Sequence, residues 1–214
     1  MSTPNPTTYH PGQVYGLSSP DGVPAVTKQE KDVLESAAAK LTEAGFPPEI
    51  VSTGSTPTFF GALDSPVINI FHPGNYVFND ALQMGLGAAE EGDCALTVLA
   101  TVISHPSEGK YLIDAGSKCF GLDQGAHGNS SVKGFGHIIG HPELVVTGLS
   151  EEVGKLTAEG PTDINVGDQL RIIPNHSCST ANFTSYYIAV RGDVIDRTIA
   201  VDLRDNSTAK NASF

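Results

Sequence analysis

The chain has 214 residues, a formal net charge of −12 and an apolar fraction of 39%. This length suffices for one substantial domain, or for a small domain with appendages. Phosphate backbones need clustered Lys and Arg, so the acidic balance argues against nucleic-acid binding, and it also disfavours anionic membrane surfaces. No stretch approaches the roughly 18 consecutive apolar residues of a membrane span.

The cysteines and the first residues bear on the compartment. Cys94, Cys119 and Cys178 form an odd set in a chain too large to need disulfides. The first residues lack the basic and apolar blocks of a secretory signal. Both features favour a reducing, cytoplasmic location.

The N-terminal part predicts a leader followed by a helix. Residues 1–26 are rich in Pro, Gly, Ser and Thr, which predicts a flexible or irregular segment. Apolar residues then recur at helical spacing over 27–45. Thr27 and Glu30 fit a capping box at the start of this helix, and Gly45 suits its C-terminal end.

After Pro48 the sequence changes to short apolar strands separated by turns. The segment 95–103 is apolar or Thr on both faces, which predicts a central strand buried on both sides. The predicted fold is mainly β, with an antiparallel β-barrel-like domain over residues 65–205, one N-terminal helix, and a polar tail at 206–214. The predicted strands are 49–53, 66–71, 95–104, 110–115, 144–148, 169–173, 183–190 and 194–202.

The most informative motif is Pro174-Asn175-His176-Ser177-Cys178, which follows an apolar run. Successive side chains of a strand alternate faces, so His176 and Cys178 are predicted to project the same way. Imidazole nitrogen and thiolate sulfur are ligands that Zn²⁺ prefers, and two of them leave positions open for water or substrate. The pair therefore predicts a catalytic zinc site. The alternative is a half-buried His beside a buried thiol.

A second motif, Ser52-Thr53-Gly54-Ser55-Thr56, leaves an apolar strand and enters a turn. Gly54 would let the backbone approach a ligand closely. Consecutive backbone N–H groups and hydroxyls can then cradle a phosphate. No Gly-Lys-Ser/Thr follows, so this is not a Walker loop. An ordinary polar turn is the alternative.

Two other segments contain residues that could contact a ligand. Tyr76 or His72 could face a ligand ring, although packing in a turn or core is the commoner fate of such residues. Asp114 and Lys118 lie near the end of a predicted strand, where a solvated ion pair is an equal alternative.

A pair of histidines, His137 and His141, is spaced i, i+4. The neighbouring glycines and Pro142 argue against a helix there, and so against a paired metal site. A zinc-only hydrolase would need a third ligand besides His176 and Cys178, and Asp114 or one of these two histidines would have to supply it.

The chain contains an ordered series of motifs: STGSTPT, HPGNYVFND, IDAGSKCFGLD, GHPELVVTGLSEEVGKL, VGDQLRIIPNHSC and YYIAVRGDVID. Over roughly residues 27–200 this series resembles the C-terminal part of the D-serine dehydratase and D-threonine aldolase family. These are fold-type III pyridoxal-phosphate enzymes similar to alanine racemase. The resemblance implies that residues 27–64 are a remnant of the end of a cofactor-binding α/β barrel, and that residues 65–205 are a metal-binding β domain.

By this resemblance, the loop from Ser52 to Thr56 would hold the cofactor phosphate, and Tyr76 would lie near the cofactor ring. His176 and Cys178 would be the zinc ligands of the dehydratase branch, because the aldolase branch has a carboxylate in place of the cysteine. In that chemistry zinc acts as a Lewis acid on the substrate's β-hydroxyl, and the pyridinium ring takes up the charge left when the α-proton departs.

The chain departs from the family pattern in its lysines. Family members carry a cofactor-binding lysine on the first strand of a longer N-terminal barrel. No lysine of this sequence stands in that context, and Lys118 is the only one near a motif. The resemblance therefore implies no catalytic residue in this chain and little or no lyase activity for it alone, since a positioned base contributes about 10²–10⁴-fold.

Two functional hypotheses follow from this resemblance. The first is the cofactor-and-metal portion of a D-serine dehydratase-like lyase, which would use zinc, act on a D-amino acid such as D-serine, and hold pyridoxal 5′-phosphate only with a barrel partner or in a full-length form. The alternative is a non-catalytic zinc-binding or scaffold β domain. An apolar face around the helix and strand 49–53 would predict a homo-oligomer or a separate barrel chain as partner.

Overall fold

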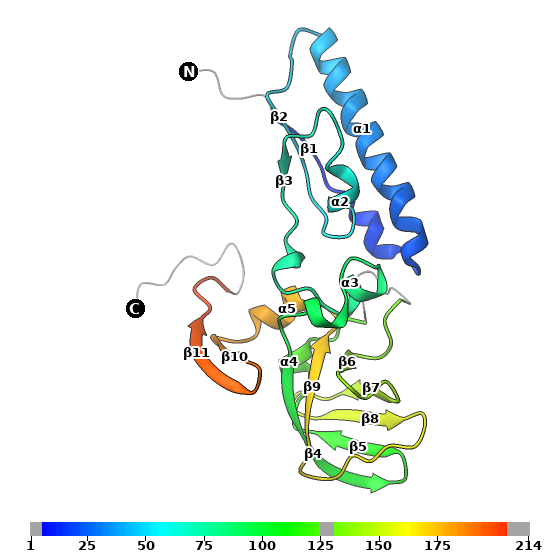
Figure 1. Cartoon of the computed structure of the whole chain (residues 1–214), viewed down its shortest axis with the longest axis vertical. Helices are drawn as coiled ribbons and strands as arrows, with labels where there is room; N and C mark the ends of the chain where they lie inside the picture. The colour runs from blue at the N-terminus through cyan, green and yellow to red at the C-terminus, as the bar shows by residue number, and fades with distance from the viewer. Residues whose placement is uncertain (1–5, 125–130, 205–214) are drawn as a thin grey trace.

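The computed structural model describes residues 6–124 and 131–204. Figure 1 shows an elongated molecule with a smaller α/β unit at the N-terminal end and a larger β unit at the other end. Within the described residues, no helix combines the length and the apolar character that crossing a membrane requires.

The N-terminal unit is built on a parallel three-stranded sheet. Its strands, in spatial order, are β1 (Pro6–Tyr9), β2 (Ile50–Thr53) and β3 (Ile70–Phe71). Helix α1 (Val23–Glu43) connects β1 to β2, and α2 (Phe59–Ala62) lies between β2 and β3 in the chain. This is the strand–helix–strand crossover from which α/β barrels are built.

The apolar side of α1 packs against this sheet. Leu34 and Ala38, spaced i, i+4 on one helix face, form a buried cluster with Val51, Ala62 and Ile68. Burying each of the larger side chains in this cluster stabilises the folded state by about 1.5–3 kcal/mol. The cluster therefore fixes α1 over β2, and with it the loop that follows β2.

Two predictions for the N-terminal part are wrong. Residues 12–22 are not irregular but form the 3-10 helices η1 (Gly12–Gly16) and η2 (Pro20–Gly22), preceded by β1. Helix α1 begins at Val23, because Pro24 is tolerated in a first helical turn. Thr27 therefore lies inside the helix, where its hydroxyl donates to the Val23 carbonyl at 2.9 Å.

The predicted helix end is confirmed. Gly45 has a φ of +86°, the left-handed conformation typical of a glycine just after a helix. Its N–H donates to the Thr42 carbonyl at 3.0 Å, and the Phe46 N–H donates to the Leu41 carbonyl at 2.8 Å. These bonds satisfy carbonyls that the end of the helix would otherwise leave unpaired.

The β unit contains a six-stranded antiparallel sheet in the order β6-β9-β4-β5-β8-β7. The strands are β4 (Val98–Ser107), β5 (Lys110–Ile113), β6 (Gly136–Ile138), β7 (Leu144–Leu149), β8 (Gly154–Ala158) and β9 (Gln169–Pro174). The Phe135 N–H donates to the Val146 carbonyl at 3.0 Å, which joins the two edge strands and nearly closes the sheet. The predicted β-barrel-like fold is confirmed.

The interior of this sheet is the main hydrophobic core. It contains thirteen buried residues: Ala100, Val102, Tyr111, Ile113, Ala115, Phe120, Ile138, Leu144, Val146, Leu156, Ile164, Leu170 and Ile172. They come from all six strands and from the segments between them, so the core depends on the closure of the sheet.

Each predicted strand overlaps an observed one, but the burial predicted for the segment 95–103 is wrong. In β4, Ala100 and Val102 face the core, whereas Leu99 is 61% exposed and Ile103 is 45% exposed. The strand curves around a closed sheet, so only its inner face is covered. No predicted strand covers β1, β6 or β8, which have four, three and five residues.

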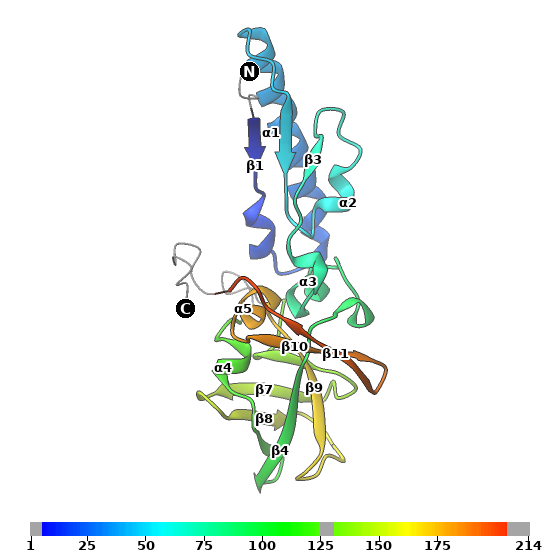
Figure 2. The same ribbon diagram turned by 90° about the vertical axis from the view of Figure 1, so that its left-hand side faces the viewer.

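The last two strands form a separate hairpin, β10 (Tyr186–Arg191) and β11 (Val194–Ala200). It contacts the rest of the molecule through Tyr187, whose ring packs edge-on against Phe78 at 5.6 Å and whose hydroxyl donates to the Ala181 carbonyl at 3.0 Å. Figure 2 shows the hairpin beside the six-stranded sheet, with α3 (Ala81–Gly85) and α5 (Ser177–Asn182) at the junction between the two units.

Candidate functional site

The two predicted zinc ligands lie at the start of α5 and not on a strand, so their predicted strand position is wrong. Strand β9 ends at Pro174, His176 is the N-cap residue of α5, and Cys178 lies in the first turn of that helix. The side chains nevertheless meet. Hydrogen bonding to Cys178 is the largest cause that raises the pKa of His176, to about 9.

Three hydrogen bonds hold the chain where it turns away from β9. The Asn175 side-chain amide donates to the carbonyls of Asp123, at 3.0 Å, and Gly134, at 2.7 Å. The Ser177 N–H donates to Asp80 Oδ2 at 2.9 Å. We call residues 174–178 the metal turn, because these contacts fix the two predicted ligands at one place.

Asp123 orients the imidazole. His176 Nδ1 lies 3.1 Å from Asp123 Oδ2, which also accepts a hydrogen bond from the Ser179 hydroxyl at 2.6 Å. Histidines that bind metals commonly donate their second ring nitrogen to a carboxylate in this way. The arrangement leaves Nε2 as the ring nitrogen that could bind an ion.

The donor set fits a zinc ion with few protein ligands. His176 and Cys178 supply the nitrogen and the sulfur that zinc prefers. Across residues 6–124 and 131–204, no group of three or more His, Cys, Asp or Glu side chains is arranged to hold a metal. The two side chains would supply only part of the coordination of a zinc ion. The other cysteines are buried in part, and desolvation raises the pKa of Cys94 to about 12 and also raises that of Cys119.

The predicted phosphate loop, from Ser52 to Thr56, is buried along its whole length. The Ser52 hydroxyl donates to Thr8 Oγ1 at 2.9 Å. The Thr53 hydroxyl donates to the Tyr9 carbonyl at 3.1 Å and to the carboxylate of Glu30, which is itself fully buried. These two hydroxyls hold the first part of the loop to β1 and α1.

Gly54 is required by close packing. A Cβ at this position would lie 2.1 Å from His72 Nδ1 and 2.6 Å from the His72 carbonyl oxygen. The loop and the chain after β3 therefore approach more closely than any other residue would allow.

The later part of the loop borders a cavity of about 780 Å³. Aromatic rings and a few polar groups line it: Thr56, Phe59, Phe60, Leu63, Phe71, His72, Pro73, Tyr76, Asn79, Ala88 and Asp93. The Thr58 hydroxyl, just beyond the loop, is buried without a hydrogen-bond partner in the described part of the chain. A cavity with aromatic walls beside a buried hydroxyl-rich loop fits a ligand that combines a ring and a phosphate.

Residues 75 and 76 connect this cavity to the metal turn. The Tyr76 N–H donates to Thr56 Oγ1 at 3.2 Å, and Asn75 Nδ2 lies 3.8 Å from Cys178 Sγ, within range of a hydrogen bond to sulfur. Both residues belong to η3 (Asn75–Val77). The structure therefore brings the predicted phosphate loop and the predicted zinc ligands to one junction.

The other predicted candidates lie elsewhere. The Asp114 carboxylate accepts a hydrogen bond from the Thr101 N–H at 2.6 Å, and Lys118 pairs with Glu152 and not with Asp114. Both residues therefore have partners outside the metal turn.

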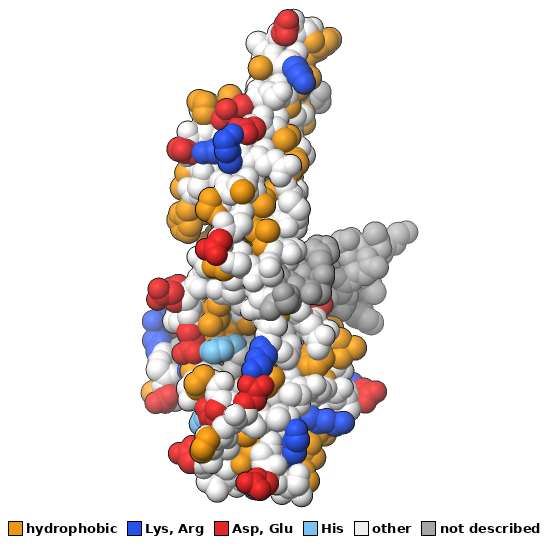
Figure 3. All heavy atoms as spheres, turned by 90° about the vertical axis from the view of Figure 1, so that its right-hand side faces the viewer, with side chains coloured by type: hydrophobic (Ala, Val, Ile, Leu, Met, Phe, Trp, Pro, Cys, Tyr) orange, Lys and Arg blue, Asp and Glu red, His pale blue; other side chains and the backbone are white. Residues whose placement is uncertain are grey.

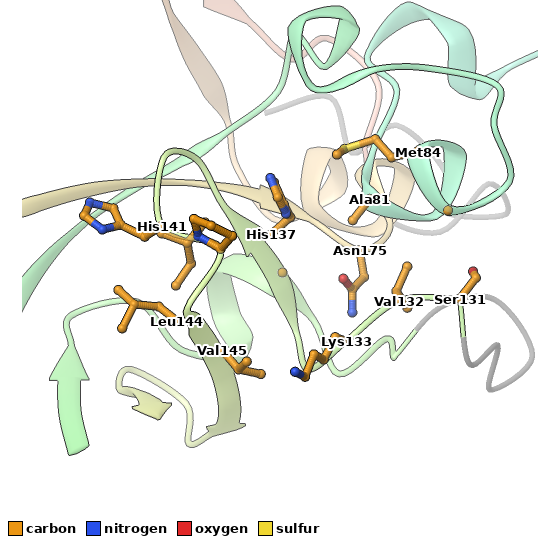
Figure 4. Close-up of a pocket in the computed structure, with 14 residues that line it drawn as sticks. Ala81, Met84, Ser131, Val132, Lys133, His137, His141, Leu144, Val145 and Asn175 are labelled. Carbon is orange, nitrogen blue, oxygen red and sulfur yellow. The ribbon is translucent and has the colours of Figure 1, made fainter. Parts of the chain in front are cut away.

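The two histidines of the 136–142 segment border a different pocket of about 270 Å³, which Figure 4 shows. His137 Nε2 lies 2.7 Å from a Glu91 carboxylate oxygen, and His141 Nδ1 lies 3.2 Å from one of Glu143. Each histidine has its own carboxylate partner, so neither joins His176 as a third ligand.

Sequence reasoning missed four residues that shape the site: Tyr15, Glu30, Asp80 and Asp123. Burial raises the pKa of Tyr15, which lies against the side chain of Ser55 and the backbone of Thr56. Of these four residues, only Asp80 could have been found from a local sequence pattern, because Asp is a common N-cap residue and Asp80 directly precedes the short helix at 81–85.

Residues 95–190 match the family described as "Putative serine dehydratase domain". The chain is 34% identical over 200 residues to D-threo-3-hydroxyaspartate dehydratase of a Delftia species, with 86% of this chain and 53% of that protein covered. It is also 34% identical over 197 residues to D-serine dehydratase of Dictyostelium discoideum, covering 86% and 50%. The chain thus spans about half the length of these relatives.

The fold agrees with the sequence comparison. The solved structure of the Delftia dehydratase superposes with a TM-score of 0.83 at 31% identity, covering 94% of this chain and 56% of that one. Structures of that enzyme include a histidine-to-alanine variant and, two positions further on, a cysteine-to-alanine variant in the metal-free form. From the motif order, the closed β sheet and these matches, the chain belongs to the D-serine dehydratase-like family of fold-type III pyridoxal-phosphate enzymes.

Proposed function

We propose that this chain forms the metal-binding and phosphate-binding part of a zinc- and pyridoxal-phosphate-dependent lyase that acts on a D-amino acid such as D-serine. The observation that carries the proposal is the junction at η3, where Tyr76 contacts the phosphate loop and Asn75 contacts Cys178. A metal and a phosphate-bearing cofactor bound there would lie next to each other.

In this proposal, His176 and Cys178 hold the zinc ion and Asp123 keeps the imidazole ring in its orientation. The two-residue spacing of the pair equals that of the substituted histidine and cysteine in the Delftia variants, which supports a metal at this position. Thr56 and the backbone near Gly54 hold the phosphate, and Tyr76 borders the place of the ring. Bound together, the two groups would supply a Lewis acid at the β-hydroxyl and an electron sink at the α-carbon.

We further propose that these 214 residues are inactive when they are alone. No lysine among them stands in the family's cofactor context. The α-proton would then lack the base that the family positions for it, a loss of about 10²–10⁴-fold in rate. The activity would depend on a barrel segment, on the same or on a separate polypeptide.

A complementation assay tests this function. Pyruvate formation from D-serine is measured for the chain alone, for a barrel-bearing homologue alone, and for their mixture, each with zinc and pyridoxal phosphate. We expect no activity from the chain alone and a gain in the mixture. A mixture no more active than the homologue would count against the lyase, and zinc binding without any gain would favour the non-catalytic zinc domain.

The exposed apolar surface predicts association. The sequence predicts this surface around the helix and strand 49–53. Strand β2 lies between β1 and β3, whereas Val33 of α1 is 41% exposed and Phe46, just after α1, is 61% exposed. Further exposed apolar side chains lie around α2 and η3, where Phe60 is 77% exposed and Tyr76 is 60% exposed. Figure 3 shows hydrophobic side chains on one face of the N-terminal unit. Exposed apolar patches of this kind commonly mark interfaces.

We therefore expect a homo-oligomer, or a complex with a separate barrel chain, formed through this surface. Light scattering of the purified chain at tens of micromolar should give a mass above 22.4 kDa. Replacing Phe60 by Ser should lower that mass, whereas replacing Leu122, which is also exposed but lies in the β unit, should not. A clean monomer would contradict the prediction of self-association.

A further inference from the structure

Asp80 is a fully buried carboxylate at the junction of the two units. As the N-cap residue of α3, it accepts a hydrogen bond from the Gln83 N–H on Oδ1 at 3.0 Å. Capping requires only this one acceptor, which Ser, Thr or Asn supplies equally well. The second oxygen of Asp80 must therefore be explained by contacts outside α3.

That oxygen, Oδ2, accepts two hydrogen bonds. One comes from the Ser177 N–H at 2.9 Å and the other from Asn75 Nδ2 at 2.6 Å. Ser177 separates His176 from Cys178 in the chain, and Asn75 is the residue that also reaches Cys178 Sγ. The carboxylate thus touches both the backbone between the two ligands and a side chain that contacts one of them.

A second contact holds the same two segments together. The Leu82 N–H of α3 donates to the Asn175 carbonyl of the metal turn at 3.4 Å. The short helix capped by Asp80 is therefore attached to the metal turn on both sides of His176, at Asn175 and at Ser177.

Burying a carboxyl group is costly unless hydrogen bonds satisfy its two oxygens. In the described part of the chain no Lys, Arg or His forms an ion pair with Asp80. Three N–H donors solvate it instead.

We propose that Asp80 is the positioning residue of the metal turn: its Oδ2 fixes the Ser177 backbone so that the side chains of His176 and Cys178 converge on one ion. The inference rests on the proposed zinc site and adds to it a residue that does not touch the metal. Outer partners of metal ligands commonly change metal affinity by about 10–100-fold when they are replaced.

The test measures the zinc affinity of the full chain and of Asp80→Ser by competition with a chromophoric chelator. Serine still caps α3, but its single oxygen cannot also reach the Ser177 N–H. We expect the variant to keep its circular dichroism spectrum and to bind zinc about 10–100-fold more weakly. Asp80→Asn, which keeps the size and one acceptor oxygen, serves as a second variant should the serine variant not fold.

Asp168→Ser is the matched control. Asp168 Oδ2 accepts a backbone hydrogen bond from the Asn165 N–H at 2.7 Å, in a loop that precedes β9. Its replacement removes a carboxylate–backbone hydrogen bond from an exposed loop away from the metal turn, and the zinc affinity should stay unchanged.

A spectroscopic measurement separates positioning from a general loss of stability. With Co²⁺ in place of zinc, the absorption bands report the geometry around the ion, and they should shift in Asp80→Ser but not in Asp168→Ser. Folded Asp80 variants with the zinc affinity and cobalt bands of the unsubstituted chain would overturn the inference. An unsubstituted chain that binds no zinc would instead overturn the proposed zinc site, and this inference with it.

Discussion

Replacing Cys178 by alanine should remove zinc from the purified chain, and His176→Ala should do the same. Each substitution takes away one of the two proposed ligands, so the metal content should fall from about one ion per chain to nearly none. Atomic absorption after dialysis against a weak chelator measures this directly. The effect is large because no third His, Cys, Asp or Glu in the described residues is placed to compensate.

Cys119→Ala is the control for this experiment. Cys119 is a free cysteine that packs against the core of the β unit, and desolvation raises its pKa. A thiol whose pKa is raised in this way is a poor metal ligand, because binding requires the thiolate. Its replacement should leave the zinc content unchanged. Equal zinc in all three variants would exclude the metal turn as the binding site.

Gly54→Ala should destabilise the N-terminal unit and weaken the binding of a phosphate-bearing ligand. The added methyl group would lie 2.1 Å from His72 Nδ1 and 2.6 Å from a backbone oxygen, so either the loop or the chain after β3 must move. Overpacking of this kind costs about 1–3 kcal/mol. Urea unfolding should show a lower midpoint, and pyridoxal phosphate should bind more weakly by fluorescence titration.

Gly74→Ala provides the comparison. Gly74 lies two residues after His72, has a φ of −96°, and has no atom within 4 Å of the position of an added Cβ. Its replacement should leave the unfolding midpoint unchanged or raise it slightly, because alanine restricts the unfolded chain. If both variants unfold at the same urea concentration, the close approach of His72 to the loop has no energetic importance.

The sequence was sufficient for the fold class and for most strands, because alternating apolar residues and turn residues are local signals. The sequence was not sufficient to predict which side chains of a strand are buried. Whether Leu99 and Ile103 are covered depends on the curvature of a closed sheet, which strands distant in the chain determine. The extension of α1 to Val23 was hidden for a similar reason: Glu30 looked like a capping residue but is bonded to Thr53 across the unit.

For the candidate site, too, local features could be predicted from the sequence, whereas features that depend on distant residues could not. The proximity of His176 and Cys178 could be predicted from their spacing, but the prediction placed them on a strand. The turn that actually carries them depends on Asp80, 97 positions away from Ser177, and on carbonyls 41 and 52 positions away from Asn175. No local pattern records such partners. Whether the two side chains bind zinc stays a prediction.

The β10–β11 hairpin has a different thermodynamic character from the sheet beside it. All residues of β11 and most of β10 are exposed, and a two-stranded ribbon is only marginally stable in water. Its free energy of opening must therefore be far below that of the closed core. The amide protons of this ribbon should therefore exchange with solvent well before those of the six-stranded sheet.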